Sequence, residues 1–334
     1  MANQNNQGIK FSGNKNNSTS HKSKIGKWIF IIITILLLAF SAMIFAGILS
    51  ILFGAISSSD DFYATSSDGN VALIKINGPI LTETSSSLFS GSEGTSSTAI
   101  VNQLEKLAKD EKIKAIMFEI NSPGGSGVAA DEISLAIKSL GKPTVAYVRN
   151  IGTSAAYWIA SSTDHVIANR LSLVGSIGVI ASYLEFSGLL ENYNVSYQRF
   201  VAGDYKDFGS PFREPTRTER ELFQEQLNQI HHIFIAEIAE NRNMSFEEVE
   251  ELANGMFVTG LQGLDLGLID DLGGKKEAII YLEEQLGFNV NVVEYRKRTS
   301  LFDLFSASQQ GRAYSIGRGI GDSLKASTSE GIII

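Results

Sequence analysis

The stretch from residue 113 to 149, IKAIMFEINSPGGSGVAADEISLAIKSLGKPTVAYVR, decides which fold the sequence predicts. It begins and ends with apolar runs of strand length, and the residues between them repeat apolar side chains at helical spacing. Two strands joined through a helix at such short spacing are typical of a parallel sheet. The sequence therefore predicts an α/β domain with a largely parallel sheet.

Similar strands and helices are expected on both sides of this stretch. Ser245 and Glu248 have the spacing of a capping box and predict the start of a helix. The periodicity of apolar residues predicts strands over 71–80, 164–170 and 174–182, a helix over 98–110, and a long amphipathic helix over 218–243.

The composition excludes several classes of function. The chain has 334 residues, of which 43% are apolar and 19% charged, so it can form one large or two modest cores. It contains no cysteine, which excludes disulfides, thiolate nucleophiles and zinc–thiolate sites. The net charge of −8 is spread along the chain, and no basic block with interleaved aromatics indicates a nucleic-acid partner.

The N-terminal region predicts a membrane anchor. Residues 1–27 are polar, basic and free of acidic side chains, as expected of a disordered tail. Residues 28–56 contain no charge and exceed the roughly 20 residues that a membrane-spanning helix needs. Lysines precede this segment, and Asp60 and Asp61 follow it, so the positive-inside rule places the N-terminus in the cytoplasm. All later residues are expected outside the cytoplasm.

The rest of the chain divides into three expected regions. Residues 57–97 form a serine-rich linker and a first strand, residues 98–295 form the main domain, and residues 296–334 form a flexible extension.

Two local motifs are candidates for chemistry, although each has a simpler interpretation. In NIGTSAAYWIA, residues 150–160, the hydroxyl of Ser154 could act as a nucleophile or could merely cap a helix. Gly124 and Gly125 leave a strand ahead of a helix, where free N–H groups could hold an oxyanion. A glycine turn there is also common for geometric reasons alone.

The polar segment VAGDYKDFGSPF contains Lys206, and most lysines in such loops are solvated surface charges. Taken in order, however, NSPGG, GTSAAYW, LVGSIGVI and AGDYKDFGSP resemble the bacterial signal peptide peptidase (protease IV) family of membrane-anchored serine proteases. The resemblance extends from about Val71 to Val293 and includes the later segment VTGLQGLDLGLIDDLGG.

The resemblance implies a crotonase or caseinolytic-protease type of fold, built from repeated strand-strand-helix units. It also implies specific roles. Ser154 would be the nucleophile, Lys206 the general base and Ser176 the group that orients the lysine. The oxyanion hole would involve Gly125, with Gly124 and Ala155 beside it. Family members often have glycine after the nucleophile, whereas Ala155 and Ala156 follow it here, and their two methyl groups are expected to narrow the site and affect substrate breadth more than activity.

A lysine can act as a general base only where its amine is shielded from water, because shielding favours the neutral form. In water, a lysine amine is neutral in only about one molecule in 2,500 at pH 7, so an exposed Lys206 would be ineffective. Burial among apolar groups would favour the neutral form, and nearby carboxylates would oppose it. The side chains of Asp204 and Asp207 are therefore expected to point away from the amine.

Other chemistries remain as alternatives. His165, His231 and His232 could in principle supply a Ser-His-Asp triad, because such triads are recognised by geometry and not by order in the chain. No His-Glu-x-x-His pattern indicates a metal site, and no cofactor is expected. The helical histidines are expected to be surface or partly buried groups.

The sequence thus predicts a single-pass membrane serine protease that cleaves short apolar peptides, such as cleaved signal peptides, through an acyl-enzyme. The resemblance further implies a homo-oligomer in which neighbouring chains supply Ser154 and Lys206 to a common site. The main alternative is a catalytically silent relative that binds peptides or acts as a scaffold for membrane proteins. An acyl-CoA enzyme of the same fold is disfavoured by the anchor.

Overall fold

The computed structural model describes residues 19–56, 62–65, 68–83 and 94–297. They belong to two compact units, the N-terminal helix and the domain that begins after it, and each unit is described by itself. Most of the expected tail, part of the expected linker and nearly all of the expected C-terminal extension lie outside the described residues.

The N-terminal unit is one helix, α1 (Thr19–Ile56). Its segment Phe30–Leu49 has a mean hydropathy of 2.7 over 20 residues, and none of it is buried. At 1.5 Å per residue this segment is about 30 Å long, enough to cross the apolar layer of a bilayer. The hydroxyl of Thr34 donates to the carbonyl of Phe30 at 2.8 Å, which satisfies it without water. The helix begins at Thr19, before the predicted apolar run.

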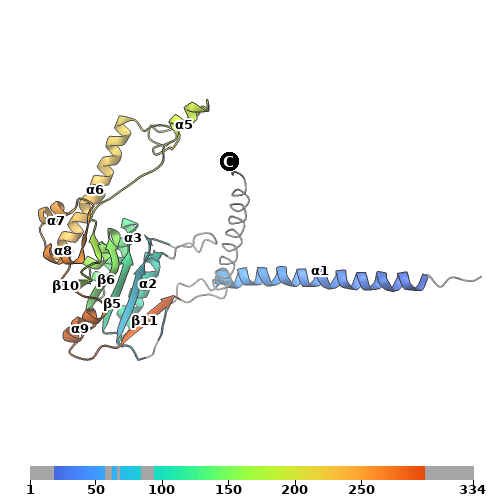
Figure 1. Cartoon of the computed structure of the whole chain (residues 1–334), viewed down its shortest axis with the longest axis horizontal. Helices are drawn as coiled ribbons and strands as arrows, with labels where there is room; N and C mark the ends of the chain where they lie inside the picture. Colours follow the sequence, from blue (N-terminus) through green and yellow to red (C-terminus); the bar gives the residue numbers. More distant parts are fainter. Residues whose placement is uncertain (1–18, 57–61, 66–67, 84–93, 298–334) are drawn as a thin grey trace, which may run out of the picture. The chain divides into compact units, whose positions relative to one another are not determined.

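The domain is built on a nine-stranded sheet in which the central strands are parallel (Figure 1). The order along the main path is β1-β11-β2-β5-β6-β7-β10, and β8 pairs with β6 and β9. The strands are β1 (Phe62–Ala64), β2 (Val71–Asn77), β5 (Ala115–Ser122), β6 (Thr144–Thr153), β7 (His165–Ala168), β8 (Leu173–Gly175), β9 (Phe257–Thr259), β10 (Asp271–Leu272) and β11 (Val292–Lys297). A separate pair consists of β3 (Ile80–Leu81) and β4 (Thr95–Ser96).

Helices cover both faces of the sheet, which explains why β5 is apolar along most of its length. Ile116 and Phe118 pack into one core, whereas Ala115 and Met117 pack into a second core that also contains residues of α9. The first core includes side chains of α2, α3, α4, α6 and α7. The helices of the domain are α2 (Ser97–Lys109), α3 (Gly127–Lys138), α4 (Ala155–Ser161), α5 (Ser187–Asn192), α6 (Arg217–Arg242), α7 (Phe246–Leu252), α8 (Gly260–Asp265) and α9 (Lys275–Leu286).

Strand β6 is shared between two neighbours. Its first half, from Val145 to Val148, pairs with β7, and its last residues, from Ile151 to Thr153, pair with β8. Thr153 lies opposite Gly175 at the end of β8. This fork brings the end of β6 and the end of β8 side by side.

The predicted α/β fold with a largely parallel sheet is confirmed, and the predicted capping box of Ser245 and Glu248 begins α7. The predicted strand over 174–182 is wrong, because β8 ends at Gly175. Gly175 and Ser176 both have positive φ, 81° and 54°, and this conformation is incompatible with an extended strand.

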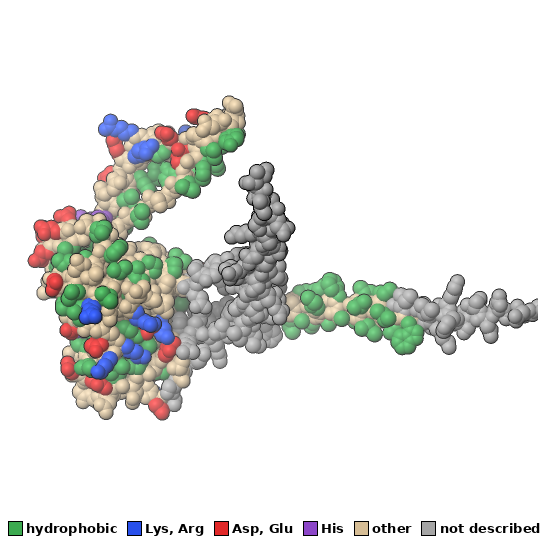
Figure 2. All heavy atoms as spheres, viewed as in Figure 1, with side chains coloured by type: hydrophobic (Ala, Val, Ile, Leu, Met, Phe, Trp, Pro, Cys, Tyr) green, Lys and Arg blue, Asp and Glu red, His purple; other side chains and the backbone are tan. Residues whose placement is uncertain are grey.

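The segment from 179 to 216, which we name the arm, connects the end of the β8 region to α6. It contains only one short helix, α5, and none of its residues is buried. Large apolar side chains on it are exposed, among them Ile180, Leu184, Tyr193 and Phe200, which is 91% exposed. In Figure 1, α5 lies beyond the N-terminal end of α6, and Figure 2 shows hydrophobic side chains over this part of the domain.

Candidate active site

Ser154 lies at the junction of β6 and α4 in a strained backbone conformation. Its φ and ψ are 54° and −128°, values that a residue with a Cβ atom adopts only at a cost of about 1–3 kcal/mol. Its N–H donates to the carbonyl of Gly175 at 2.8 Å, so the fork between β6 and β8 helps to hold the turn. Ser154 precedes the helix as its N-cap residue, yet its side chain makes no capping hydrogen bond. The simple capping interpretation of this serine is therefore wrong.

Helix α4 behind Ser154 is anchored in the core. Tyr157 is fully buried, and its hydroxyl donates to the carbonyl of Leu268 at 2.7 Å. Burial raises the pKa of this phenol above its ordinary value, so it stays a neutral donor. The ring of Trp158 stacks on Phe234 of α6 with the centroids 5.1 Å apart. These contacts fix the helix from which Ser154 projects.

The glycine turn after β5 lies against Ser154. Gly124 has a φ of +104°, and the three atoms nearest to a Cβ placed there belong to residues 153–155. Gly125 is held against β3, because the N–H of Ile80 donates to the carbonyl of Gly124 at 3.0 Å and the carbonyl of Ile80 accepts from Ser126 at 2.8 Å. A Cβ at position 125 would lie 2.0 Å from the Ile80 oxygen, so only glycine fits.

Two backbone N–H groups near Ser154 are available to a ligand. Among the described residues, the N–H groups of Gly125 and Ala155 have no hydrogen-bond acceptor. The N–H of Gly124 is already used, since it donates to the hydroxyl of Ser122 at 3.1 Å. Gly124 therefore allows the glycine turn to lie close to Ser154. Gly125 and Ala155 have free N–H donors of the kind that stabilise an oxyanion.

Ser122 is a residue of the site that motif reasoning missed. Its side chain is fully buried and donates to the carbonyl of Gly78 at 2.6 Å while it accepts from Gly124. The serine is visible in the NSPGG motif, but its partner lies 44 positions earlier in the chain. No local pattern could have indicated that contact.

Ser176 lies next to the Ser154 turn, since Gly175 before it is paired with Thr153. Its φ of 54° ends β8, its N–H donates to the carbonyl of Met256 at 3.0 Å, and its hydroxyl donates to the carbonyl of Gly255 at 2.9 Å. These bonds fix the hydroxyl oxygen, whose lone pairs can still accept a hydrogen bond.

Lys206 is not brought to this site within one chain. It lies in a turn of the arm, where its N–H donates to the carbonyl of Gly203 at 3.2 Å and its side chain is exposed. Among the described residues, no hydrogen bond joins its amine to Ser154 or Ser176. The carboxylate of Asp207 binds Arg199 and Arg213.

The histidines do not complete a triad with Ser154. His165 pairs with Val145 near the start of β6, and at 3.3 Å per residue this is roughly 26 Å from the end of that strand at Thr153. Its ring is 2.9 Å from Asp271 and stacks on Tyr281. His231 and His232 belong to α6, and the ring of His232 contacts Phe246. Nor do the described residues contain a group of three acidic or histidine side chains that could hold a metal ion.

The chain is similar to several known proteins. The model of peptidase family S49 matches residues 136–289, and the Clp protease model matches residues 68–181. A putative protease of Methanocaldococcus jannaschii is 33% identical over 67% of the chain and 72% of its own length. A putative signal peptide peptidase SppA of Enterococcus faecium is 32% identical over 80% of the chain and 76% of its own length. A solved mutant of the 1510-N membrane-bound stomatin-specific protease is 16% identical, with a TM-score of 0.41 over 64% of this chain and 85% of that one.

Proposed function

Because this chain belongs to peptidase family S49, the serine proteases that include signal peptide peptidase SppA and protease IV, we propose that Ser154 is its nucleophile and Lys206 of a neighbouring copy its base. One observation supports the nucleophile above all. Ser154 lies in a strained turn, and its hydroxyl makes no hydrogen bond that caps α4. Beside it lie two backbone N–H groups without an acceptor among the described residues. Strain of this kind is typical of functional sites, where it holds a group ready for reaction.

The proposed reaction proceeds through an acyl-enzyme. The Ser154 oxygen attacks the peptide carbonyl carbon, and the Lys206 amine accepts the hydroxyl proton. The carbonyl oxygen becomes an oxyanion, which the N–H groups of Gly125 and Ala155 stabilise. The carbon–nitrogen bond then breaks, and the Lys206 ammonium gives its proton to the leaving amine. A water molecule then attacks the carbonyl carbon of the acyl-enzyme and gives a proton to the Lys206 amine. The ester carbon–oxygen bond breaks, the ammonium returns the proton to the Ser154 oxygen, and the acid leaves. Ser176 accepts a hydrogen bond from the lysine throughout.

The position of Lys206 favours a site shared between chains. An exposed lysine would be almost wholly protonated, so the amine needs an apolar cover that its own chain does not supply. The arm around it exposes Tyr193, Phe200 and Tyr205, and so large an apolar surface is typical of protein interfaces. Docking of the arm onto a second copy would bury these side chains and bring Lys206 to the neighbour's Ser154.

We further propose that α1 anchors the chain in the cell membrane, with the N-terminus in the cytoplasm and the protease domain outside. The segment Phe30–Leu49 has the length and hydropathy of a membrane span, and the lysines lie before it. Short apolar peptides, such as the remnants of cleaved signal peptides, would then meet the protease at high local concentration. They are the substrate class that this arrangement favours.

Co-expression of two inactive chains tests the shared site. A Ser154→Ala chain and a Lys206→Ala chain, each with its own affinity tag, are purified through both tags in detergent and assayed on a fluorogenic apolar peptide. We expect each variant alone to be inactive and the mixed oligomer to regain a substantial part of wild-type activity. A mixed oligomer verified by mass that stays inactive would refute the shared site. Labelling of Ser154 by a serine-reactive phosphonate in the wild type, and not in Ser154→Ala, separately tests the nucleophile.

A further inference from the structure

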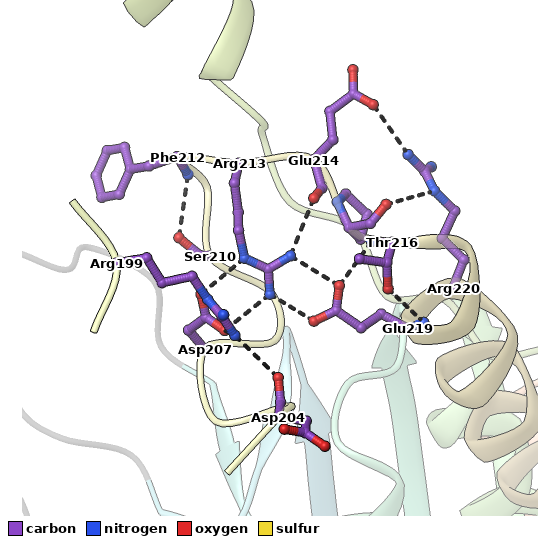
Figure 3. Close-up of polar contacts among 11 residues, drawn as sticks. Arg199, Asp204, Asp207, Ser210, Phe212, Arg213, Glu214, Thr216, Glu219 and Arg220 are labelled. Atoms are coloured by element: carbon purple, nitrogen blue, oxygen red, sulfur yellow. Dashed lines mark hydrogen bonds and ion pairs between the residues drawn. The ribbon is translucent and has the colours of Figure 1, made fainter. Parts of the chain in front are cut away.

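A network of four charged side chains joins the turn of Lys206 to the start of α6 (Figure 3). At its centre, Arg213 binds two carboxylates at once. Its Nε and Nη2 donate to Asp207 at 2.8 and 3.0 Å, and its Nη1 and Nη2 donate to Glu219 at 2.9 and 2.6 Å. Arg199 approaches Asp207 from the other side at 2.6 and 2.7 Å.

The network is firmly attached to the helix. Glu219 is 3% exposed and forms the capping box of α6 with Thr216, accepting from its N–H at 2.8 Å. The hydrogen bond from Arg213 is the largest cause that lowers the pKa of Glu219 to about 2, so this carboxylate is ionised throughout the physiological range. One side of Arg213 is therefore fixed to the first turn of a helix.

The other side of Arg213 holds the turn that contains Lys206. Local hydrogen bonds close this turn, from Lys206 to Gly203, from Phe208 to Tyr205 and from Ser210 to Asp207. They set its shape but not its place on the domain. The side chain of Asp207, which directly follows Lys206, supplies the polar link from the turn to α6, because Arg213 bridges it to Glu219. Hydrogen bonds from Arg199 and Arg213 hold the pKa of Asp207 well below its ordinary value.

We propose that Arg213 is a positioning residue for Lys206, which it holds in place by bridging Asp207 to Glu219 at the start of α6. This inference rests on the proposed role of Lys206 as the general base. The planar guanidinium serves two carboxylates in fixed geometry, and a lysine at position 213 would offer only a point charge. The same bonds occupy the Asp207 carboxylate, which would otherwise be free to pair with the Lys206 ammonium and stabilise its inactive charged form.

The test compares Arg213→Ala and Arg213→Lys with Arg217→Ala in the full chain. Arg217 is the matched control, since it is an arginine near the start of the same helix and its ion pair with Glu221 is exposed. Misplacing a reacting group by about 1 Å costs on the order of 100-fold in rate. We therefore expect kcat to fall about 100-fold in Arg213→Ala, with KM within about twofold of the wild type. Arg213→Lys should recover little of this loss, and Arg217→Ala should be unchanged.

Further measurements separate a loss of positioning from general damage to the protein. Millimolar methylguanidinium should restore part of the kcat of Arg213→Ala and should not affect Arg217→Ala. Asp207→Asn should lower kcat similarly, and the double variant should be no worse than either single one, because both changes break the same link. The oligomer mass of every variant should match the wild type. The thermal midpoint of each variant should stay above the assay temperature, although Arg213→Ala should lower it because the buried Glu219 loses its partner. If Arg213→Ala does not fold, Arg213→Lys with and without methylguanidinium supplies the same comparison.

The outcomes distinguish this inference from the function on which it rests. If Lys206→Ala is inactive while Arg213→Ala keeps wild-type kcat, the positioning role is refuted and the general base stands. If Arg213→Ala loses activity only through a raised KM, or only with loss of the oligomer, the positioning role is also refuted. If Lys206→Ala itself keeps full activity, the proposed general base is wrong, and the positioning role of Arg213 is refuted with it.

Discussion

Gly124 and Ser154 are in such close contact that a Cβ atom at position 124 would lie 2.8 Å from the Cβ of Ser154. The two residues leave neighbouring parallel strands, β5 and β6, and both have positive φ. Each backbone is therefore shaped by the other, and the proposed nucleophile and the proposed oxyanion loop form one unit. This relationship leads to the first prediction.

Gly124→Ala should inactivate the enzyme. The added methyl group would push against Ser154 and the Thr153 carbonyl, and alanine is strained at a φ of +104°. Displacing an oxyanion donor costs roughly 100- to 1,000-fold in kcat, and we expect a loss of this size in a peptide-cleavage assay. Gly127→Ala is the matched control, because a Cβ there meets nothing within 4 Å. Equal activity of the two variants would contradict the proposed oxyanion loop.

Ser154→Ala and Lys206→Ala should each abolish peptide hydrolysis. Removing a member of a catalytic unit typically costs several powers of ten, and the losses are not additive. The double variant should therefore be no less active than either single variant when cleavage is measured on purified full-length chains. The circular dichroism spectra should be unchanged, since Ser154→Ala removes one oxygen and the Lys206 side chain is exposed in the single chain. Near-normal turnover in either variant would exclude the Ser/Lys mechanism.

The rate of peptide cleavage should rise with pH and level off only above about pH 8. The neutral amine is the active form of a lysine base, so deprotonation increases the fraction of active enzyme. The measurement is kcat/KM against pH for the wild type in detergent. A profile with its midpoint near 6.5, flat by pH 7.5, would instead indicate histidine as the base.

Asp270→Asn should destabilise the domain at neutral pH and much less in acid. Burial by itself would raise the pKa of Asp270, but its hydrogen bonds and ion pair with Arg242 outweigh burial and lower the pKa. A carboxylate with a lowered pKa stabilises the fold at pH values above its pKa in the unfolded chain, about 3.9. This stabilisation is lost as the pH falls through the pKa that the carboxylate has in the folded chain. Breaking such a pair costs about 3 kcal/mol, which lowers the thermal midpoint by roughly 6–12 °C.

Asp271→Asn is the control for this prediction. Its side chain is 65% exposed and pairs with His165 at the surface, so the change should cost less than about 1 kcal/mol. The comparison uses thermal unfolding of both variants and the wild type at pH 7 and at a pH below the folded pKa of Asp270. A difference between Asp270→Asn and the wild type that stays the same at both pH values would contradict the assigned cause.

The sequence by itself determined most elements of the fold. Helix and strand periods are local properties, so the strands around 113–149, the apolar helix and the long helix α6 were predicted from spacing alone. The capping box at Ser245 was predicted for the same reason, because both partners lie within four residues. The motif order indicated the family and the turn that contains Ser154.

Only the tertiary structure decided the geometry of the site. The strand predicted over 174–182 ends at Gly175, where Gly175 and Ser176 have positive φ and the N–H of Ser176 donates to the distant carbonyl of Met256. The contacts of Ser122 with Gly78 and of Ile80 with the glycine turn join segments that are 44 or more residues apart, and no local period encodes them. The strained turn of Ser154 likewise depends on Gly175 and on the packing of α4.

Lys206 shows most clearly the difference between what the local sequence determines and what the tertiary structure determines. The motif predicted which lysine would act, but the folded chain leaves it on an exposed arm, tied by Arg213 to α6 and apart from Ser154. The local sequence encodes the turn, because short-range hydrogen bonds close it. The direction of the arm depends on α6, whose apolar contacts with the core lie only in its C-terminal half. The resemblance implies that a neighbouring chain supplies Lys206 to the site of Ser154, and chain connectivity leaves this lysine on the exposed arm.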